Sequence, residues 1–313
     1  MIAITLAGYI FARIVKVTDE QQKFMSRLLL YFINPFLVLN SFNMEFSWHK
    51  FGQLWFAALI ALVMHGVMIL LGILSSKEKI DRIAVAFTNC GFVGIPLIRG
   101  VFGDEGVFYL MGYLIIFNVL VWTYGYYQLS GTTNLKKVIT NPNIIAVTIG
   151  LVLFCIPVEL PELVKKPIVM IADINTPMAM LLLGILFARF EFDKTYIVRI
   201  IKTTLFRLVV ASLCNLVVIL IAYKIFANMQ DIKMMLFAIY ICSMCPVATT
   251  IPGLAVVFDH DKSFASLIVT ITSMFCILTI PTFVALAEWV VGLLQLLRHC
   301  ERSAAIHVFE CIL

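Results

Sequence analysis

The sequence has few charged residues, and this shortage excludes most classes of soluble protein. Asp, Glu, Lys and Arg make up 13% of its 313 residues, about half the share usual in soluble domains. Residues of the set AVILMFWYC make up 62%, and the mean hydropathy is +1.02. A soluble fold of this length has too small an interior to hide so much apolar surface, so we expect a protein of the lipid bilayer. The formal charge of +5 comes without a dense basic block, which argues against a nucleic-acid partner.

Patterns of metal, disulfide and enzyme chemistry are also missing. The eight cysteines lack the spacing of a disulfide framework or a zinc site. Cys242 and Cys245 form a CxxC, but they lie in an apolar segment beside Pro246, so we interpret them as small core residues. Neither GxSxG nor HExxH occurs. We therefore expect no metal, no cofactor and no enzymatic activity.

Charge-free windows predict ten transmembrane helices with mostly short connections. The windows cover residues 1–15, 26–44, 51–74, 82–101, 105–128, 140–158, 167–188, 200–224, 233–258 and 263–296. We divide the chain into a first five-helix repeat (1–129), a short cytoplasmic linker (130–141), a second repeat (142–297) and a disordered tail (298–313). No cleavable signal peptide is evident.

The positions of lysine and arginine predict the orientation. Most of the 23 basic residues fall in the first, third, fifth, seventh and ninth connections. Cytoplasmic connections of membrane proteins are enriched in these residues. We therefore expect a multi-pass protein of the plasma or inner membrane with both termini outside.

Short motifs recur in the two halves of the chain. Ile95-Pro96 and Ile251-Pro252 are separated by 156 residues, and each is followed by Val-Phe at the same distance. Asn34-Pro35 also resembles the later Asn175-Thr176-Pro177. Because each half holds an odd number of predicted spans, the second half enters the membrane upside down relative to the first. Inverted repeats with interrupted helices at matched positions are typical of secondary transporters, so the predicted fold is an all-α membrane protein with a 5+5 inverted repeat.

The fourth and ninth spans carry the residues that break helices. Proline removes a helical hydrogen bond, and a broken helix persists in a bilayer only where protein or a water-filled cavity surrounds it. Half-helix N-termini at such breaks direct partial positive charge towards the membrane centre, where Asn89, Thr249 and Thr250 supply hydrogen bonds. The alternative is that both breaks are tolerated kinks. The expected substrate-binding residues are Asn34, Asn89, Cys90, Gly91, Gly94, Pro96, Asn118, Pro246, Thr249, Thr250 and Pro252.

Charged residues within predicted spans are candidates for coupling or gating. Asp173 lies about two turns into the seventh span, and we consider it a proton site, a cation site or a gate. Arg207 and Glu288 are weaker candidates. For all three, the alternative is a side chain that reaches the interface with water.

Four stretches carry a family resemblance: FTNCGFVGIPLI (87–98), FGDEG (102–106), YLIIFNVLVWTYG (113–125) and DINTPMAMLLLGILFA (173–188). They resemble the auxin efflux carrier family, which includes plant auxin carriers and bacterial malate and malonate carriers. The resemblance implies crossing broken helices four and nine, a scaffold of helices one, two, six and seven, and a fold like that of bile-acid sodium symporters. It also implies a substrate beside Asn89 and a homodimer through the scaffold.

The most specific hypothesis is a secondary carrier that exports or exchanges small organic anions, such as mono- or dicarboxylates or auxin-like acids. The short linker and the loose match of the ninth span favour a small carboxylate over auxin itself. Two alternatives stay open. The first is a symporter coupled to sodium or protons, and the second is a membrane sensor that binds a ligand without moving it.

Overall fold

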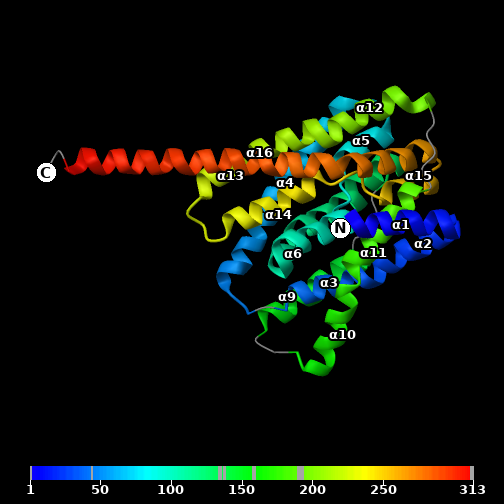
Figure 1. Ribbon diagram of the computed structural model, residues 1–313, viewed down its shortest axis with the longest axis horizontal. Helices are drawn as coiled ribbons and strands as arrows, with labels where there is room; N and C mark the ends of the chain where they lie inside the picture. The colour runs from blue at the N-terminus through cyan, green and yellow to red at the C-terminus, as the bar shows by residue number, and fades with distance from the viewer. Residues whose placement is uncertain are drawn as a thin grey trace.

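The protein is almost entirely helical. The computed structural model describes residues 2–43, 45–132, 136, 139–156, 160–188 and 194–310. Within these ranges no strand forms, and the only β-type pairing is an isolated antiparallel bridge between Thr88 and Val247. Most long helices run roughly along one direction, and the N-terminal end of α1 and the C-terminal end of α16 point to the same side (Figure 1). The expected all-α fold is confirmed for the described residues.

The first half of the chain holds elements up to α7, in which η1, η2 and η3 are π-helical turns. These elements are α1 (Ile2–Val15), α2 (Asp19–Leu28), η1 (Leu29–Ile33), α3 (Asn34–Ser41), α4 (Trp48–Ser75), α5 (Lys79–Ala86), η2 (Cys90–Gly94), α6 (Ile95–Leu120), η3 (Val121–Gly125) and α7 (Tyr126–Ser130). Helix α6 is bent at Gly103, whose φ is 66°. This bend lies where the predicted windows 82–101 and 105–128 meet.

The second half begins at α9. Its elements are α9 (Pro142–Cys155), α10 (Glu162–Asp173), α11 (Asn175–Ala188), the 3-10 turn η4 (Lys194–Tyr196), α12 (Ile197–Leu205), the π-helical turn η5 (Phe206–Val210), α13 (Ala211–Phe226), α14 (Ile232–Met244), α15 (Thr250–Val257) and α16 (Lys262–Glu310). Part of the predicted linker, residues 133–135, 137 and 138, lies outside the described residues.

Six helical stretches of the described chain are long and apolar enough to cross a membrane. They are Glu20–Ser41, Trp48–Ser75, Cys90–Ser130, Glu162–Ala188, Lys194–Phe226 and Lys262–Gln295. Ala3–Val15, Pro142–Cys155 and Ile232–Met244 are shorter apolar helices. These lengths and compositions support a multi-pass membrane protein. The ten-span count and the inverted repeat remain predictions.

The predicted tail, residues 298–313, is described only in part. Helix α16 continues without interruption to Glu310, its end projects beyond the rest of the molecule (Figure 1), and residues 311–313 lie outside the described residues. No proline or glycine follows Gly292. Because those two residues are the strongest helix breakers, nothing in the local sequence stops the helix.

One group of helices packs around α1 and α11. A Cβ atom on Gly8 would lie 2.3 Å from the Leu181 carbonyl oxygen, and one on Gly184 would lie 2.0 Å from the Thr5 carbonyl oxygen. The two backbones therefore touch, as small residues allow in membrane helix pairs. Helix α3 packs against α9 and α10. We call α1, α2, α3, α9, α10 and α11 the first helix group.

The remaining long helices form a second group with a larger core. Helix α4 packs against α5 and α6, and α14 packs against α6 and α13. Their interface buries large side chains, including Tyr109, Tyr113 and Tyr240. We call α4 to α7 and α12 to α16, with η2, η3 and η5, the second helix group. The candidate site lies where the two groups meet.

Candidate functional site

Two interrupted helices cross at the centre of the second group. The chain is extended between α5 and η2, and again between α14 and α15. The Asn89 N–H donates to the Pro246 carbonyl at 2.7 Å, and the Ala248 N–H donates to the Phe87 carbonyl at 3.1 Å. The hydroxyl of Thr272 on α16 accepts from the Val247 N–H at 3.1 Å. Backbone groups that the breaks release are therefore paired within the protein, as the bilayer interior requires.

The prolines of this region have different roles from those we expected. Pro246 lies within the second break, where its missing N–H removes no helical bond. Pro96 is in the first turn of α6 and Pro252 is in the first turn of α15. The first N–H groups of a helix have no acceptor within that helix, so Pro252 fits at the start of α15 at little cost. Pro96 instead lies inside the helical stretch Cys90–Ser130, because η2 runs directly into α6. Both prolines follow the extended segments that form the breaks.

Arg207 holds the C-terminal ends of both broken helices. It lies in η5 and is fully buried. Its guanidinium donates to the Val85 carbonyl at 2.8 Å, to the Cys245 carbonyl at 3.1 Å and to the Ser243 carbonyl. Its Nη1 also lies 3.0 Å from the Met68 sulfur. A cation is favoured at helix C-termini by the helix dipole, so Arg207 satisfies the last carbonyls of α5 and α14 at the same time.

Close packing of the two breaks depends on Gly94. A Cβ atom there would lie 3.0 Å from the Cys242 sulfur and 3.3 Å from the Cys245 sulfur. Both cysteines are buried and free, and their position against Gly94 fits the interpretation that they are small core residues. Cys90 is also buried in this contact. A side chain at position 94 would separate the crossing helices.

A small polar cavity lies beside the crossing. It has a volume of about 50 Å³ and is lined by Asn89, Thr249 and Thr250. The Thr249 hydroxyl donates to the Asn89 side-chain oxygen at 3.5 Å, whereas the buried Thr250 hydroxyl has no partner in the structure. Asn118 lines the same cavity and accepts from the Asn141 side chain at 3.0 Å. Amide and hydroxyl groups from both helix groups thus converge next to the N-terminal ends of η2 and α15.

A larger cavity continues from the small one to the surface. It has a volume of about 450 Å³ and shares Tyr31, Asn89, Trp122, Thr249 and Thr250 with the small cavity. At its other end it is lined by Lys23 and Arg27 of α2, and no Asp or Glu is among the described residues that line it. Both basic side chains are exposed. Their charges make the opening electropositive, which attracts anions.

The structure brings only some of the expected site residues to these cavities. Asn89, Gly91, Asn118, Thr249, Thr250 and Pro252 line one or both of them. Cys90, Gly94, Pro96, Pro246, Asn34 and Asp173 line neither. Asn34 instead donates to the Gly91 carbonyl at 3.1 Å and accepts from Asn175. It therefore joins η2 to α11 as an interhelical contact.

Asp173 lies apart from the cavities and pairs with a residue of the second helix group. Its carboxylate is 2.7 Å from Arg99 on α6. Arg99 also pairs with Asp104 at 2.9 Å and donates to the Ala172 carbonyl at 3.2 Å, while Asn40 of α3 donates to Asp104 at 3.3 Å. We call these residues the Arg99 contact. It connects the first helix group to the second.

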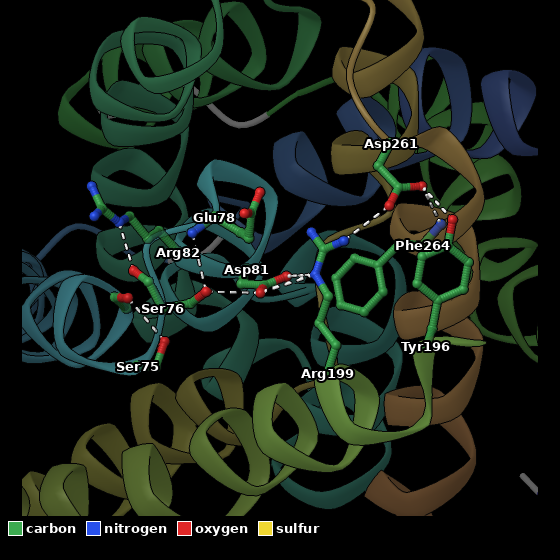
Figure 2. Close-up of polar contacts among 10 residues, drawn as sticks. Ser75, Ser76, Glu78, Asp81, Arg82, Tyr196, Arg199, Asp261 and Phe264 are labelled. Atoms are coloured by element: carbon green, nitrogen blue, oxygen red, sulfur yellow. Dashed lines mark hydrogen bonds and ion pairs between the residues drawn. The ribbon is translucent and has the colours of Figure 1, made fainter. Parts of the chain in front are cut away.

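A second polar cluster joins three elements of the second group (Figure 2). Arg199 of α12 contacts Asp81 of α5 at 2.9 and 3.1 Å and Asp261 at 2.9 Å. Its guanidinium lies 3.8 Å above the Phe264 ring of α16. Asp261 also accepts from the Tyr196 hydroxyl at 3.2 Å and from the Phe264 N–H at 3.0 Å. This Arg199 cluster holds the ends of α5, α12 and α16 together.

Sequence reasoning missed several residues that shape the site. Lys23, Arg27 and Tyr31 were not selected, although their spacing of four residues places them on one face of a helix. Trp122 was also not selected, because sequence alone does not distinguish a cavity-lining aromatic residue from the other aromatic residues of apolar spans. Arg207 was noted only as a weak candidate for transport, and its contacts with two distant helix ends are not visible in the local sequence.

Comparison with known protein families gives a match over most of the chain. The family model described as membrane transport protein matches residues 1–134 and 127–284. A search of curated proteins finds no match for the chain. The matched residues cover both crossing helices, both helix groups and the cavities between them. The chain therefore belongs to the membrane transport protein family, the family of auxin efflux carriers that its motifs resemble.

Proposed function

We propose that this membrane transporter is a secondary carrier of small organic anions. The observation that carries the proposal is the crossing of two broken helices beside a polar cavity whose opening is lined by Lys23 and Arg27. Amide and hydroxyl groups of Asn89, Thr249 and Thr250 supply hydrogen bonds to a carboxylate. The nearby N-terminal ends of η2 and α15 add partial positive charge. An anion is thus held without a buried basic side chain in direct contact.

The same contacts support an inverted repeat of ten spans. The two backbone bonds at the crossing, Asn89 to Pro246 and Ala248 to Phe87, flank one antiparallel bridge between the two breaks. Asn34 and Asn175, which belong to the repeated motifs, also contact each other. Contacts between the matched segments of two halves are expected when the halves are related by an axis in the membrane plane. We assign the first helix group as the scaffold, through which the chain forms a homodimer, and the second as the moving domain.

In this proposal the structure represents the inward-facing state of the carrier. The larger cavity opens at Lys23 and Arg27, on the side that the basic connections place in the cytoplasm. At the opposite side, the Arg99 contact joins the two groups. Movement of the second group against the first exposes Asn89 and Thr250 to alternate sides.

Flux through reconstituted vesicles tests the proposal. Purified protein is expected to move labelled malate or malonate, and Asn89→Ala is expected to abolish this flux, because the amide at the crossing is lost. Asn215→Ala is the matched control, since Asn215 is buried in α13 and lines neither cavity. No flux with a broad carboxylate panel contradicts the proposal, and ligand binding without flux identifies a sensor. Imposed sodium or proton gradients distinguish coupled symport from exchange.

A further inference from the structure

A second large cavity lies between the helix groups, beside η2. It has a volume of about 770 Å³, which is within the range of ligand pockets in proteins. Helices α1 and α11 form one wall, and η2, α6 and α16 form the other. Leu6 and Ile277 line it and are 56% and 39% exposed. The cavity is therefore a groove that is accessible from the surrounding bilayer.

The walls of this groove are apolar except for one stripe on α1. Among the described residues that line it, only Thr5, Tyr9 and Arg13 have a polar side chain besides a cysteine. Their spacing of four residues places them in a row on one face of the helix. The Thr5 hydroxyl donates to the Met180 sulfur at 3.8 Å, and the Arg13 guanidinium lies 5.5 Å from the Tyr9 ring centroid.

The charge of the groove is concentrated at one end. Within the described part of the chain, Arg13 is the only charged residue that lines it, and it lies in the last turn of α1. At a rise of 1.5 Å per residue, Arg13 is about 12 Å along the helix axis from Thr5. The positive-inside rule places the Arg13 end at the cytoplasmic surface. The groove therefore runs from a cation at the interface into a long apolar channel.

We propose that this groove binds an anionic phospholipid of the cytoplasmic leaflet. The phosphate lies against the Arg13 guanidinium, and one acyl chain extends past Tyr9 and Thr5 between α1 and α16. Basic groups at the cytoplasmic ends of membrane helices attract anionic headgroups, and the apolar walls match a hydrocarbon chain. The polar cavity at Asn89 has different chemistry and does not compete for this ligand. Because the groove separates the two helix groups, a bound lipid is in position to alter their relative movement.

Native mass spectrometry of the purified full-length protein tests this assignment. We expect one phosphatidylglycerol per protomer, bound about fivefold more tightly than phosphatidylcholine with the same acyl chains, the effect of one basic residue near the surface. Arg13→Gln is expected to remove this preference. Lys77→Gln is the control, because it removes one exposed cation from the same predicted membrane side without touching the groove.

A second pair of variants tests the location of the acyl chain. Ile277→Trp narrows the groove and is expected to weaken binding of both lipids at least severalfold. Leu278→Trp adds the same indole at the neighbouring, 68% exposed position outside the groove and is expected to bind as the parent does. Leu6→Trp fills the groove from the opposite wall and repeats the test if Ile277→Trp does not fold.

Three results would overturn the proposal. They are an unchanged headgroup preference in Arg13→Gln, equal binding of lipid by Ile277→Trp and Leu278→Trp, and a bound fatty acid or second protein copy in place of a phospholipid. Lipid binding is measured without any transport substrate. Its failure is therefore distinct from a failure of the proposed carrier function.

Discussion

At the scale of single residues, Arg207 shows how a buried charge is stabilised without an acidic partner. All the hydrogen-bond partners given above for its guanidinium are neutral, and three of them are carbonyls at or just beyond the ends of α5 and α14. Helix breaks leave such carbonyls without intrahelical donors. One planar guanidinium, with five donors in a fixed fork, reaches several of them together. Arg207 therefore stabilises the crossing of the two broken helices, and it lines neither the small cavity nor the larger one.

Replacing Arg207 is expected to destabilise the protein. Arg207→Met leaves the carbonyls of Val85, Ser243 and Cys245 buried without donors, at a cost of about 1–3 kcal/mol for each unsatisfied group. Arg207→Lys keeps the charge but reaches fewer acceptors, so its loss is smaller. Thermal unfolding in detergent measures both. Arg27→Met, which removes an exposed arginine, is the control and keeps the parent melting temperature; equal stability of Arg207→Met would refute this role.

At the scale of helical elements, the Arg199 cluster connects the ends of three helices. Asp81 precedes the predicted span 82–101 and is 3% exposed. Burial raises the pKa of its carboxyl, although the Arg199 guanidinium and the Ser76 hydroxyl act in the opposite direction. Because the folded pKa lies above the unfolded value, Asp81 contributes most stability at low pH. That contribution falls as the pH rises through the folded pKa.

The loss caused by Arg199→Met is therefore expected to depend on pH. Without the guanidinium, the pKa of Asp81 rises further and its carboxylate is left unpaired, which costs about 3 kcal/mol for a largely buried ion pair. Protonation of Asp81 removes this cost, so the drop in melting temperature is larger at pH 8 than at pH 5. Adding Asp81→Asn to Arg199→Met is expected to restore part of the stability at pH 8. A loss that is independent of pH would show that the ion pair is not its source.

At the scale of the whole molecule, two helix groups touch on one side and separate on the other. The Arg99 contact closes one side through Asp173, Asp104 and Asn40, and the larger cavity opens at the side of Lys23 and Arg27. Asp173 was expected to be a proton site, a cation site or a gate. Its position favours the third of these, since it pairs across the boundary between the groups.

Under the proposed carrier mechanism, neutralising this contact is expected to favour the outward-facing state. The measurement uses Thr250→Cys. In the Asp173→Asn background, this cysteine is expected to react with a membrane-impermeant thiol reagent added outside several times faster than it does in the parent background. Stability changes by less than about 1 kcal/mol, because Asp173 is exposed and such pairs contribute little. Glu105→Gln breaks the Lys50–Glu105 pair within the second group and serves as the control. Equal labelling in both variants would contradict a gating role.

The sequence by itself determined that this protein lies in a lipid bilayer, that it is helical and to which family it belongs. The low charge content and long apolar windows required a bilayer, and the residues 87–98 and 173–188 carried the family resemblance that the family match confirms. It also placed Asn89, Thr249 and Thr250 in the region of the breaks. These inferences succeeded because composition and helix-breaking residues act locally, and they need no knowledge of which segments meet.

Only the tertiary structure decided which residues meet at the site. In a bilayer the lipid-facing and protein-facing sides of a helix are both apolar, so periodicity does not identify the buried face as it does in soluble proteins. Sequence therefore did not separate Asn118, which lines a cavity, from Cys90, which packs in the core. The pairs Arg99–Asp173 and Arg207–Cys245 join segments far apart in the chain. Such contacts depend on how the helices pack, and no local pattern records that packing.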